Sequence, residues 1–124
     1  MKKVIALLSA TVWIGISEFI RNQFLLKQFW IDHYKSLGLV FPLEPVNGAI
    51  WGIWSVMFAV LILILAQKFS LIQTALISRL AAFIMMWVTI GNLMVLPFGI
   101  LWYAVPLSLL EAFLAAWIIK KTDK

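Results

Sequence analysis

The sequence contains no cysteine, a single histidine and few charged residues, which make up 12% of the chain. Without cysteine there is no disulfide, no thiolate nucleophile and no cysteine-based metal site. The one histidine, His33, lies beside Asp32 without any repeated carboxylate motif. The chain also lacks an HExxH motif, a Gly-rich phosphate loop and a Ser/His/Asp set in plausible register. We therefore expect no metal, no cofactor and no enzyme activity.

Apolar residues dominate what is present, at 65% of the 124 positions. A soluble domain of this size could not bury so much apolar surface, whereas a lipid bilayer can accommodate it. The net charge of +5 comes from basic residues scattered at the edges of apolar runs rather than gathered in a patch. This distribution is typical of a membrane protein and gives no indication of a nucleic-acid partner.

Four apolar runs are close to the roughly 20 residues that a membrane-spanning helix needs. They cover residues 4–20, 48–67, 75–96 and 100–119. We predict an all-α, polytopic integral membrane protein, with residues 1–124 forming a single domain that is a four-transmembrane-helix bundle. The N-terminal run imitates a secretory signal, but Leu8 occupies a position where a cleavage site needs a small residue, so we expect the span to be retained.

Local signals mark several helix ends. Asn47-Gly48 predicts a turn followed by an N-cap, and Ser70 with Gln73 three residues later predicts a capping box. Pro97 and Gly99 are expected to end the third span and begin the fourth.

The segment 21–37 follows the first span and is rich in charge. Its polar positions, among them Gln28, Asp32 and Lys35, recur at helical spacing. We interpret it as an amphipathic extension of the first helix at the outer interface, either running straight on or bending near Gly15. Gly38 is expected to stop this helix.

The basic residues predict the orientation. Lys2, Lys68 and Lys120 fall on one side of a four-span arrangement, which places both termini in the cytoplasm and the protein in the cell (inner or plasma) membrane. Arg21, Lys27 and Lys35 in the first loop argue for the opposite orientation. Arg79 is expected to snorkel to the inner headgroups.

Small and weakly polar residues form a stripe along each predicted span. The four stripes are Thr11, Gly15, Glu18 and Asn22; Gly48, Gly52, Ser55 and Ala59; Ser78, Ala82, Met85, Thr89 and Asn92; and Ala104, Ser108, Glu111 and Ala115. Small residues let helices approach closely in lipid, so the glycines, alanines and serines are expected to pack helix against helix. The carboxylates need another explanation, because a charge at mid-bilayer costs at least about 2.5–3.5 kcal/mol.

Glu111 is the deeper acid, roughly 18 Å from the start of its helix. Pro106 lies five residues earlier, leaves the Trp102 carbonyl without its helical donor and favours a kink. Glu111, with Ser108 one turn away, is thus a candidate to bind a proton, an ion or a substrate. The alternative is a protonated or hydrogen-bonded acid that joins two helices.

Glu18 lies nearer the outer surface, with Arg21 and Asn22 within one helical turn. These three residues, with Asn92 at similar depth, are candidates for an outward-facing polar mouth. Local pairing of Glu18 with Arg21, or anchoring of Arg21 at lipid phosphates, is the alternative.

Three functions fit these observations. The first is a homo-oligomeric transporter or permeation protein for a small solute or ion, because four helices alone enclose little of a pathway. The second is a non-catalytic accessory subunit, or a binder of lipid or another apolar ligand, working with a larger membrane partner. The third, a membrane enzyme, would need Glu18, Arg21 and His33 to converge with Asp32 in one cleft. We favour the first, because buried acids are costly to retain without a role.

Overall fold

Five helices make up the part of the chain that the computed structural model describes, residues 1–123. The first is α1 (Lys2–Phe19), which continues as a π-helical segment, η1 (Ile20–Leu25). It is followed by α2 (Lys27–Ser36) and α3 (Pro45–Ala66). The fourth consists of α4 (Leu71–Arg79), the π-helical η2 (Leu80–Ile84) and α5 (Met85–Asn92) in succession. The fifth is α6 (Leu101–Thr122), entered through a short 3₁₀ turn, η3 (Phe98–Ile100).

Four of these helices are long and apolar enough to cross a membrane. They run over Lys2–Leu25, Pro45–Ala66, Leu71–Asn92 and Phe98–Thr122. The first of them extends beyond its predicted span because η1 continues the helix to Leu25, and the third begins at Leu71, four residues before the predicted start at 75. The all-helical class and the four long apolar helices are therefore as the sequence predicts.

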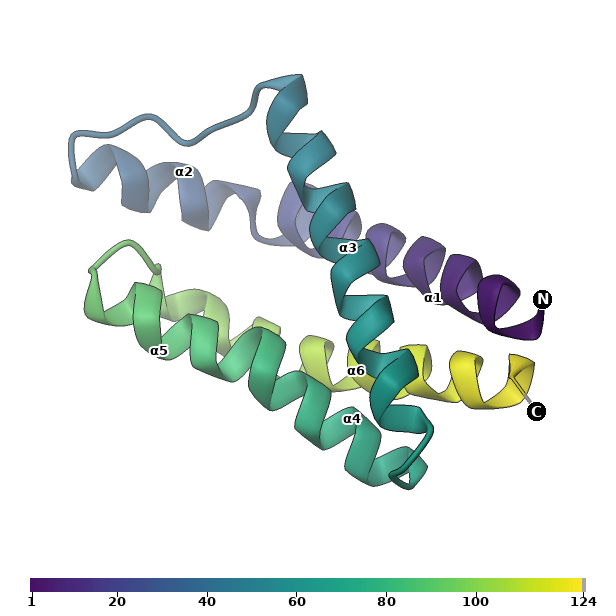
Figure 1. Cartoon of the computed structure of the whole chain (residues 1–124). Coiled ribbons are helices and arrows are strands. Elements are labelled where there is room, and N and C mark those ends of the chain that lie inside the picture. The colour runs from purple at the N-terminus through teal and green to yellow at the C-terminus, as the bar shows by residue number, and fades with distance from the viewer. Residues whose placement is uncertain (124) are drawn as a thin grey trace.

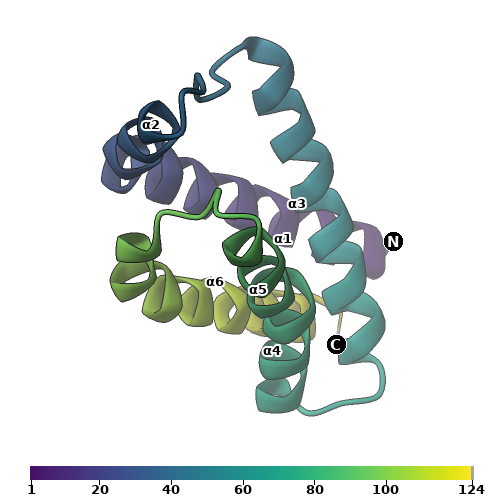
Figure 2. The same cartoon turned by 90° about the vertical axis from the view of Figure 1, so that its left-hand side faces the viewer.

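Helix α6 is the central element, packed against α1 on one side and α4 on the other. Helix α3 crosses this group steeply and contacts α1, α4 and α6 (Figure 1). Both chain ends lie at one end of the bundle, together with the α3–α4 turn; we call this the terminal end. The opposite end, where α2 and the α5–α6 connection lie, we call the loop end. In Figure 2, α2 turns away from the direction of α1.

Polar contacts hold the terminal end together. Lys3 Nζ forms an ion pair with Asp123 Oδ2 at 2.8 Å and donates to Gln67 Oε1 at 2.9 Å. Gln67 in turn donates to Asp123, and Lys120 Nζ donates to the Ala66 carbonyl. The hydrogen bonds from Gln67 and Lys3 lower the pKa of Asp123. The ends of α1, α3 and α6 are thereby tied to one another.

An apolar core fills the bundle from the terminal end to its middle. Alanines supply much of it: Ala6 and Ala10 on α1 and Ala112, Ala115 and Ala116 on α6 are fully buried. Their small side chains let α1 and α6 approach closely, as expected for helices that associate in lipid. Larger side chains from α1, α3 and η2 complete this core.

Two of the predicted helix boundaries are confirmed. Ser70 Oγ accepts from the Gln73 backbone N–H at 3.2 Å, and the Gln73 side chain accepts from the Ser70 backbone N–H at 3.1 Å, forming a capping box. Gly38 has φ +75° just after α2, where the Leu39 N–H donates to Tyr34 and the Gly38 N–H to Lys35. This is a Schellman motif, which favours glycine because of the positive φ.

Two other boundary predictions are wrong, and a third is correct in one of its two alternatives. Helix α3 begins at Pro45, and Asn47 lies inside its first turn, where its Oδ1 accepts from the Glu44 N–H at 2.9 Å. The first helix runs on past Gly15 to Leu25 and changes direction only at Leu26 (φ −115°, ψ 0°), so the alternative of a bend near Gly15 is wrong. The third long helix ends at Asn92, before the predicted 96, because the backbone turns through a positive φ of 66° at Met94.

The predicted polar stripes are only partly buried. The stripe on α6 faces the core throughout, from Ala104 to Ala115. The third stripe faces the core at Ser78 but is exposed at Met85, Thr89 and Asn92, because the wider turn of η2 rotates the following residues away.

Within this chain, the glycines of the second stripe do not pack helix against helix as predicted. Gly48 and Gly52 are exposed, and a Cβ added at either position would meet no atom within 4 Å.

Candidate functional site

Three charged side chains from two helices meet in the interior and form what we call the ionic cluster: Glu18, Arg21 and Glu111. Glu111 is 0% exposed, Glu18 4% and Arg21 6%. Nη2 of Arg21 pairs with Oε1 of Glu18, and Nη1 of Arg21 lies 3.8 Å from Oε1 of Glu111. Asn22 completes the environment by donating its Nδ2 to Oε2 of Glu18 at 2.9 Å.

The two π-helical segments meet at this cluster. Arg21 lies in η1, and its guanidinium carbon is 5.0 Å from the centroid of the Phe83 ring, which η2 supplies. Phe83 is 1% exposed and packs edge-on against Phe58 and Trp54. π-Helical turns occur frequently at functional sites, and here they bring a cation and an aromatic face together.

Glu111 approaches Arg21 from α6. Neither of its carboxyl oxygens forms a hydrogen bond within residues 1–123, and neither does Nη1 of Arg21. Trp13 fixes this turn of α6 by donating its Nε1 to the Glu111 backbone carbonyl at 3.0 Å. One guanidinium faces two carboxyl groups, so the cluster is neutral when one acid holds a proton and has a charge of −1 when neither does.

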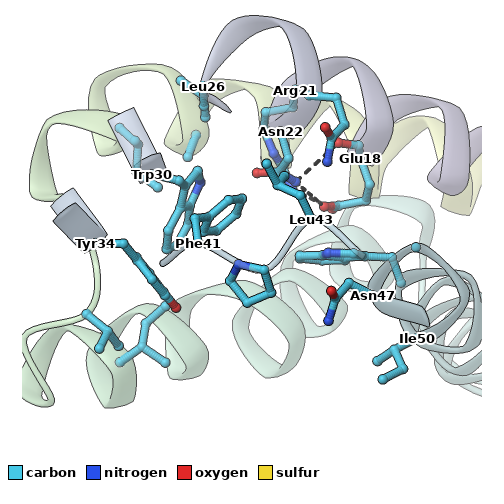
Figure 3. Close-up of a pocket in the computed structure, with 18 of the residues that line it drawn as sticks. Glu18, Arg21, Asn22, Leu26, Trp30, Tyr34, Phe41, Leu43, Asn47 and Ile50 are labelled. Atoms are coloured by element: carbon cyan, nitrogen blue, oxygen red, sulfur yellow. Dashed lines mark hydrogen bonds and ion pairs between the residues drawn. The ribbon is translucent and has the colours of Figure 1, made fainter. Parts of the chain in front are cut away.

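A cavity of about 520 Å³ extends from this cluster towards the loop end (Figure 3). Glu18, Arg21 and Asn22 line one side of it, and Asn47 and Ile50 of α3 lie across from them. Aromatic side chains supply much of the remaining wall: Trp30, Tyr34, Phe41, Trp51 and Trp87. A largely apolar cavity of this size with a few polar groups has the character of a small-molecule binding site.

Helix α2 and the segment after it form the cover of the cavity. Phe41 stacks on Trp30 at a centroid distance of 5.8 Å and meets Tyr34 edge-on at 5.1 Å. The cover is held to the loop end of the bundle, where Nε2 of His33 lies 2.7 Å from the Met94 carbonyl oxygen. Leu26, 1% exposed, packs there with the beginning of α6.

The cavity is closed towards the terminal end. The apolar core described above begins directly below the ionic cluster, with Ile14 on α1 and Ala112 on α6 fully buried. Within the described residues, packed apolar side chains thus separate the cavity at the loop end from the terminal end.

The other predicted site residues lie away from the cavity. Asn92 is exposed at the last position of α5 and does not line the cavity. Ser108 is fully buried, but its Oγ accepts from Nε of Arg79 at 3.1 Å and donates to the Val105 carbonyl at 3.0 Å. Among the predicted candidates, the structure brings together Glu18, Arg21, Asn22 and Glu111.

The prediction that Arg79 snorkels to headgroups is wrong. Arg79 lies about 12 Å along the helix that begins at Leu71. Its Nη2 donates to the Val105 carbonyl at 3.0 Å, and its guanidinium lies 5.9 Å from the Trp87 ring. Partners on α6 thus hold this half-buried cation against the bundle, which no local sequence pattern indicates.

The aromatic wall and Asn47 were missed as site residues. The sequence does show that aromatic residues are frequent after Lys27. The amphipathic pattern of this segment led us to interpret them as the face of a helix that lies at the membrane interface. The hypothesis of an enzyme cleft needed His33 and Asp32 to join Glu18 and Arg21, but neither His33 nor Asp32 lines the cavity.

The arrangement supplies binding groups rather than a recognisable catalytic set. In residues 1–123, no group of three or more His, Asp or Glu side chains is placed to hold a metal ion. In comparisons with known proteins, no family model, no curated protein and no solved structure matches this chain.

Proposed function

We propose that this protein is an integral membrane carrier that binds a small solute in the loop-end cavity and moves it across the bilayer. In this proposal the four long helices cross the cell membrane with both termini in the cytoplasm, so that the cavity lies in the outer half of the bundle. Glu111 holds or releases a proton as the ionic cluster rearranges. The positively charged terminal end supports this orientation.

One observation carries the proposal: the cavity of about 520 Å³ is lined by the buried pair Glu18 and Arg21, and Glu111 lies next to this pair in the interior, 3.8 Å from Arg21. Charged groups inside a membrane protein are costly and commonly mark substrate or proton pathways. The closed terminal end favours a carrier in a one-side-open state over an open pore. A single chain builds the whole cavity, so the proposal does not need the predicted second copy, which stays a prediction.

Proton movement in reconstituted vesicles tests this function. Vesicles that contain the protein and an internal pH-sensitive dye are given a proton gradient, and one probe is then added to each preparation. The four probes represent four solute classes: tetraethylammonium (a cation), gluconate (an anion), glycerol (uncharged and polar) and monooctanoylglycerol (uncharged and amphipathic). We expect one class to accelerate proton movement at least several-fold in wild type and in Glu111→Asp, but not in Glu111→Gln. Equal rates in wild type and Glu111→Gln with every probe would overturn the carrier function.

A second candidate function is a binding protein without transport, and the solid core below the cavity favours it. It predicts that a probe binds with the same affinity in wild type and Glu111→Gln while neither moves protons. The same vesicle preparations separate the two candidates, because binding and flux are measured independently.

A further inference from the structure

The cavity has a side opening as well as a loop-end cover. Its walls include Ile50 and Trp51 of α3 and Met86 and Ile90 of α5. Helix α3 packs against α1, α4 and α6, and the loop end of α3 stands away from α5 (Figures 1 and 2). Ile50 and Trp51 are exposed as well as lining the cavity, so the cavity meets the outside of the bundle beside α3, on the side that faces α5.

The rim of this opening is apolar. Ile50 is 56% exposed and Trp51 40% exposed, and both also line the cavity. They lie within the first two turns of α3, about 9 Å from its beginning. In a protein that crosses the membrane, residues at this depth face the boundary between headgroups and acyl chains. A ligand can reach the cavity through such a rim without passing through water.

The acidic side chains that line the cavity are already compensated. Glu18 is paired with Arg21 and receives a hydrogen bond from Asn22. Glu44 stands at the N-cap of α3, where the positive end of the helix dipole offsets its charge. An anionic head group would meet an Arg21 that already faces two carboxyl groups, a cationic one would have to compete with Arg21 for Glu18, and either would lose its hydration.

Side-chain amides can satisfy an uncharged head group instead. Asn22, Gln23 and Asn47 all line the cavity; Asn22 offers its acceptor oxygen and Asn47 its donor nitrogen beyond the hydrogen bonds given above, and Gln23 carries both a donor and an acceptor. Hydroxyl, ester and amide groups fit such a set, and the aromatic wall fits an apolar chain.

We infer that the ligand of this cavity is an uncharged amphipathic molecule that enters from the bilayer between α3 and α5. This inference rests on the proposed function, because it names the class of solute for the same site. It commits to a membrane-borne molecule with an apolar chain and an uncharged, hydrogen-bonding head group, such as a monoacylglycerol.

Two glycines of α3 provide a matched test. Gly48 and Gly52 are both exposed on the same helix, and an added Cβ would meet no atom within 4 Å at either site. Only Gly48 lines the cavity. A tryptophan at position 48 should fill the opening, whereas a tryptophan at position 52 should leave it free.

The experiment is native mass spectrometry of purified protein incubated with equimolar 1-monooleoylglycerol, oleate and oleylamine. We expect wild type and Gly52→Trp to retain monooleoylglycerol at least tenfold over the two charged probes, and Gly48→Trp to lose this retention at least tenfold. Gly48→Leu provides the same comparison if the larger side chain lowers the melting temperature.

Three results would overturn the inference. Preferential retention of oleate or oleylamine would show that the head group is charged. Equal retention by Gly48→Trp and Gly52→Trp would show that the molecule binds elsewhere, and equal retention of all three probes would show unspecific uptake. None of these results removes the carrier function, which depends on the proton flux of the Glu111 variants.

Discussion

Replacing Arg21 by methionine is the most informative perturbation of the ionic cluster. The substitution keeps an apolar stem of similar length and removes the guanidinium, the cation closest to two buried carboxyl groups. Removing one partner of a buried ion pair costs about 3–5 kcal/mol, because the remaining charge stays buried without compensation. Both Glu18 and Glu111 would lose their cation, so we expect Arg21→Met to lower the free energy of unfolding by an amount in this range. The middle of the range, about 4 kcal/mol, corresponds to roughly a thousandfold change in the unfolding equilibrium constant.

Replacing either acid should destabilise the protein less than Arg21→Met does, and Glu18→Gln should cost more than Glu111→Gln. In Glu18→Gln, Arg21 keeps a carboxyl group 3.8 Å away on α6, so we expect a loss of about 1–3 kcal/mol. In Glu111→Gln, the pair of Arg21 with Glu18 remains intact, and we expect a change within about 1 kcal/mol. The double variant Arg21→Met, Glu18→Gln should be more stable than Arg21→Met alone.

Unfolding in mixed micelles, driven by an increasing fraction of sodium dodecyl sulfate, measures these differences. The seven tryptophans provide the fluorescence signal. Lys35→Met on α2 is the control, because Lys35 is exposed. The reasoning fails if Arg21→Met unfolds within 1 kcal/mol of this control, or if Glu111→Gln is the most destabilised variant.

Three further predictions concern the helix ends and the terminal end. Gly38→Ala should lower stability by about 1–2 kcal/mol, because alanine disfavours the φ of +75°. Gly15→Ala should be neutral or slightly stabilising, because Gly15 lies in a helix where an added Cβ meets no atom within 4 Å; thermal melting of both variants tests this. Ser70→Ala should cost about 1 kcal/mol through loss of the capping box, and unchanged melting would contradict the cap assignment. Asp123→Asn should melt below wild type at pH 7. Because the pKa of Asp123 is lowered in the folded state, this gap should persist above the ordinary value of 3.8 and close as the pH falls below it; a gap that does not depend on pH would contradict the contacts with Lys3 and Gln67.

Local features of the fold could be predicted because they depend on neighbouring residues. The capping box at Ser70 and the stop at Gly38 are set within a few positions of the chain, and both were predicted correctly. The buried stripe of α6 follows a regular helical period from Ala104 to Ala115. Each of these predictions needs no knowledge of another helix.

Features that depend on an irregular turn or a distant partner could not be predicted. The π-helical turn at residues 80–84 shifts the helical face, so a regular period fails for Met85 and Thr89. The pairing of Glu18 with Arg21 is local, but the approach of Glu111 depends on how α6 packs against α1.

The cavity needed tertiary information for the same reason. It depends on where α2 and the segment after it lie at the loop end, and α2 begins after the irregular backbone of Leu26.

Sidedness of labelling tests the central claim most directly, namely that the chain crosses the bilayer with its cavity in the outer half, away from the termini. The chain has no cysteine, so single substitutions Gln23→Cys, in the cavity lining, and Lys68→Cys, in the α3–α4 turn, can be labelled one at a time with a membrane-impermeant maleimide. In intact cells we predict labelling of position 23 from outside and labelling of position 68 only after the membrane is opened. Labelling of both positions from the same side would contradict the account.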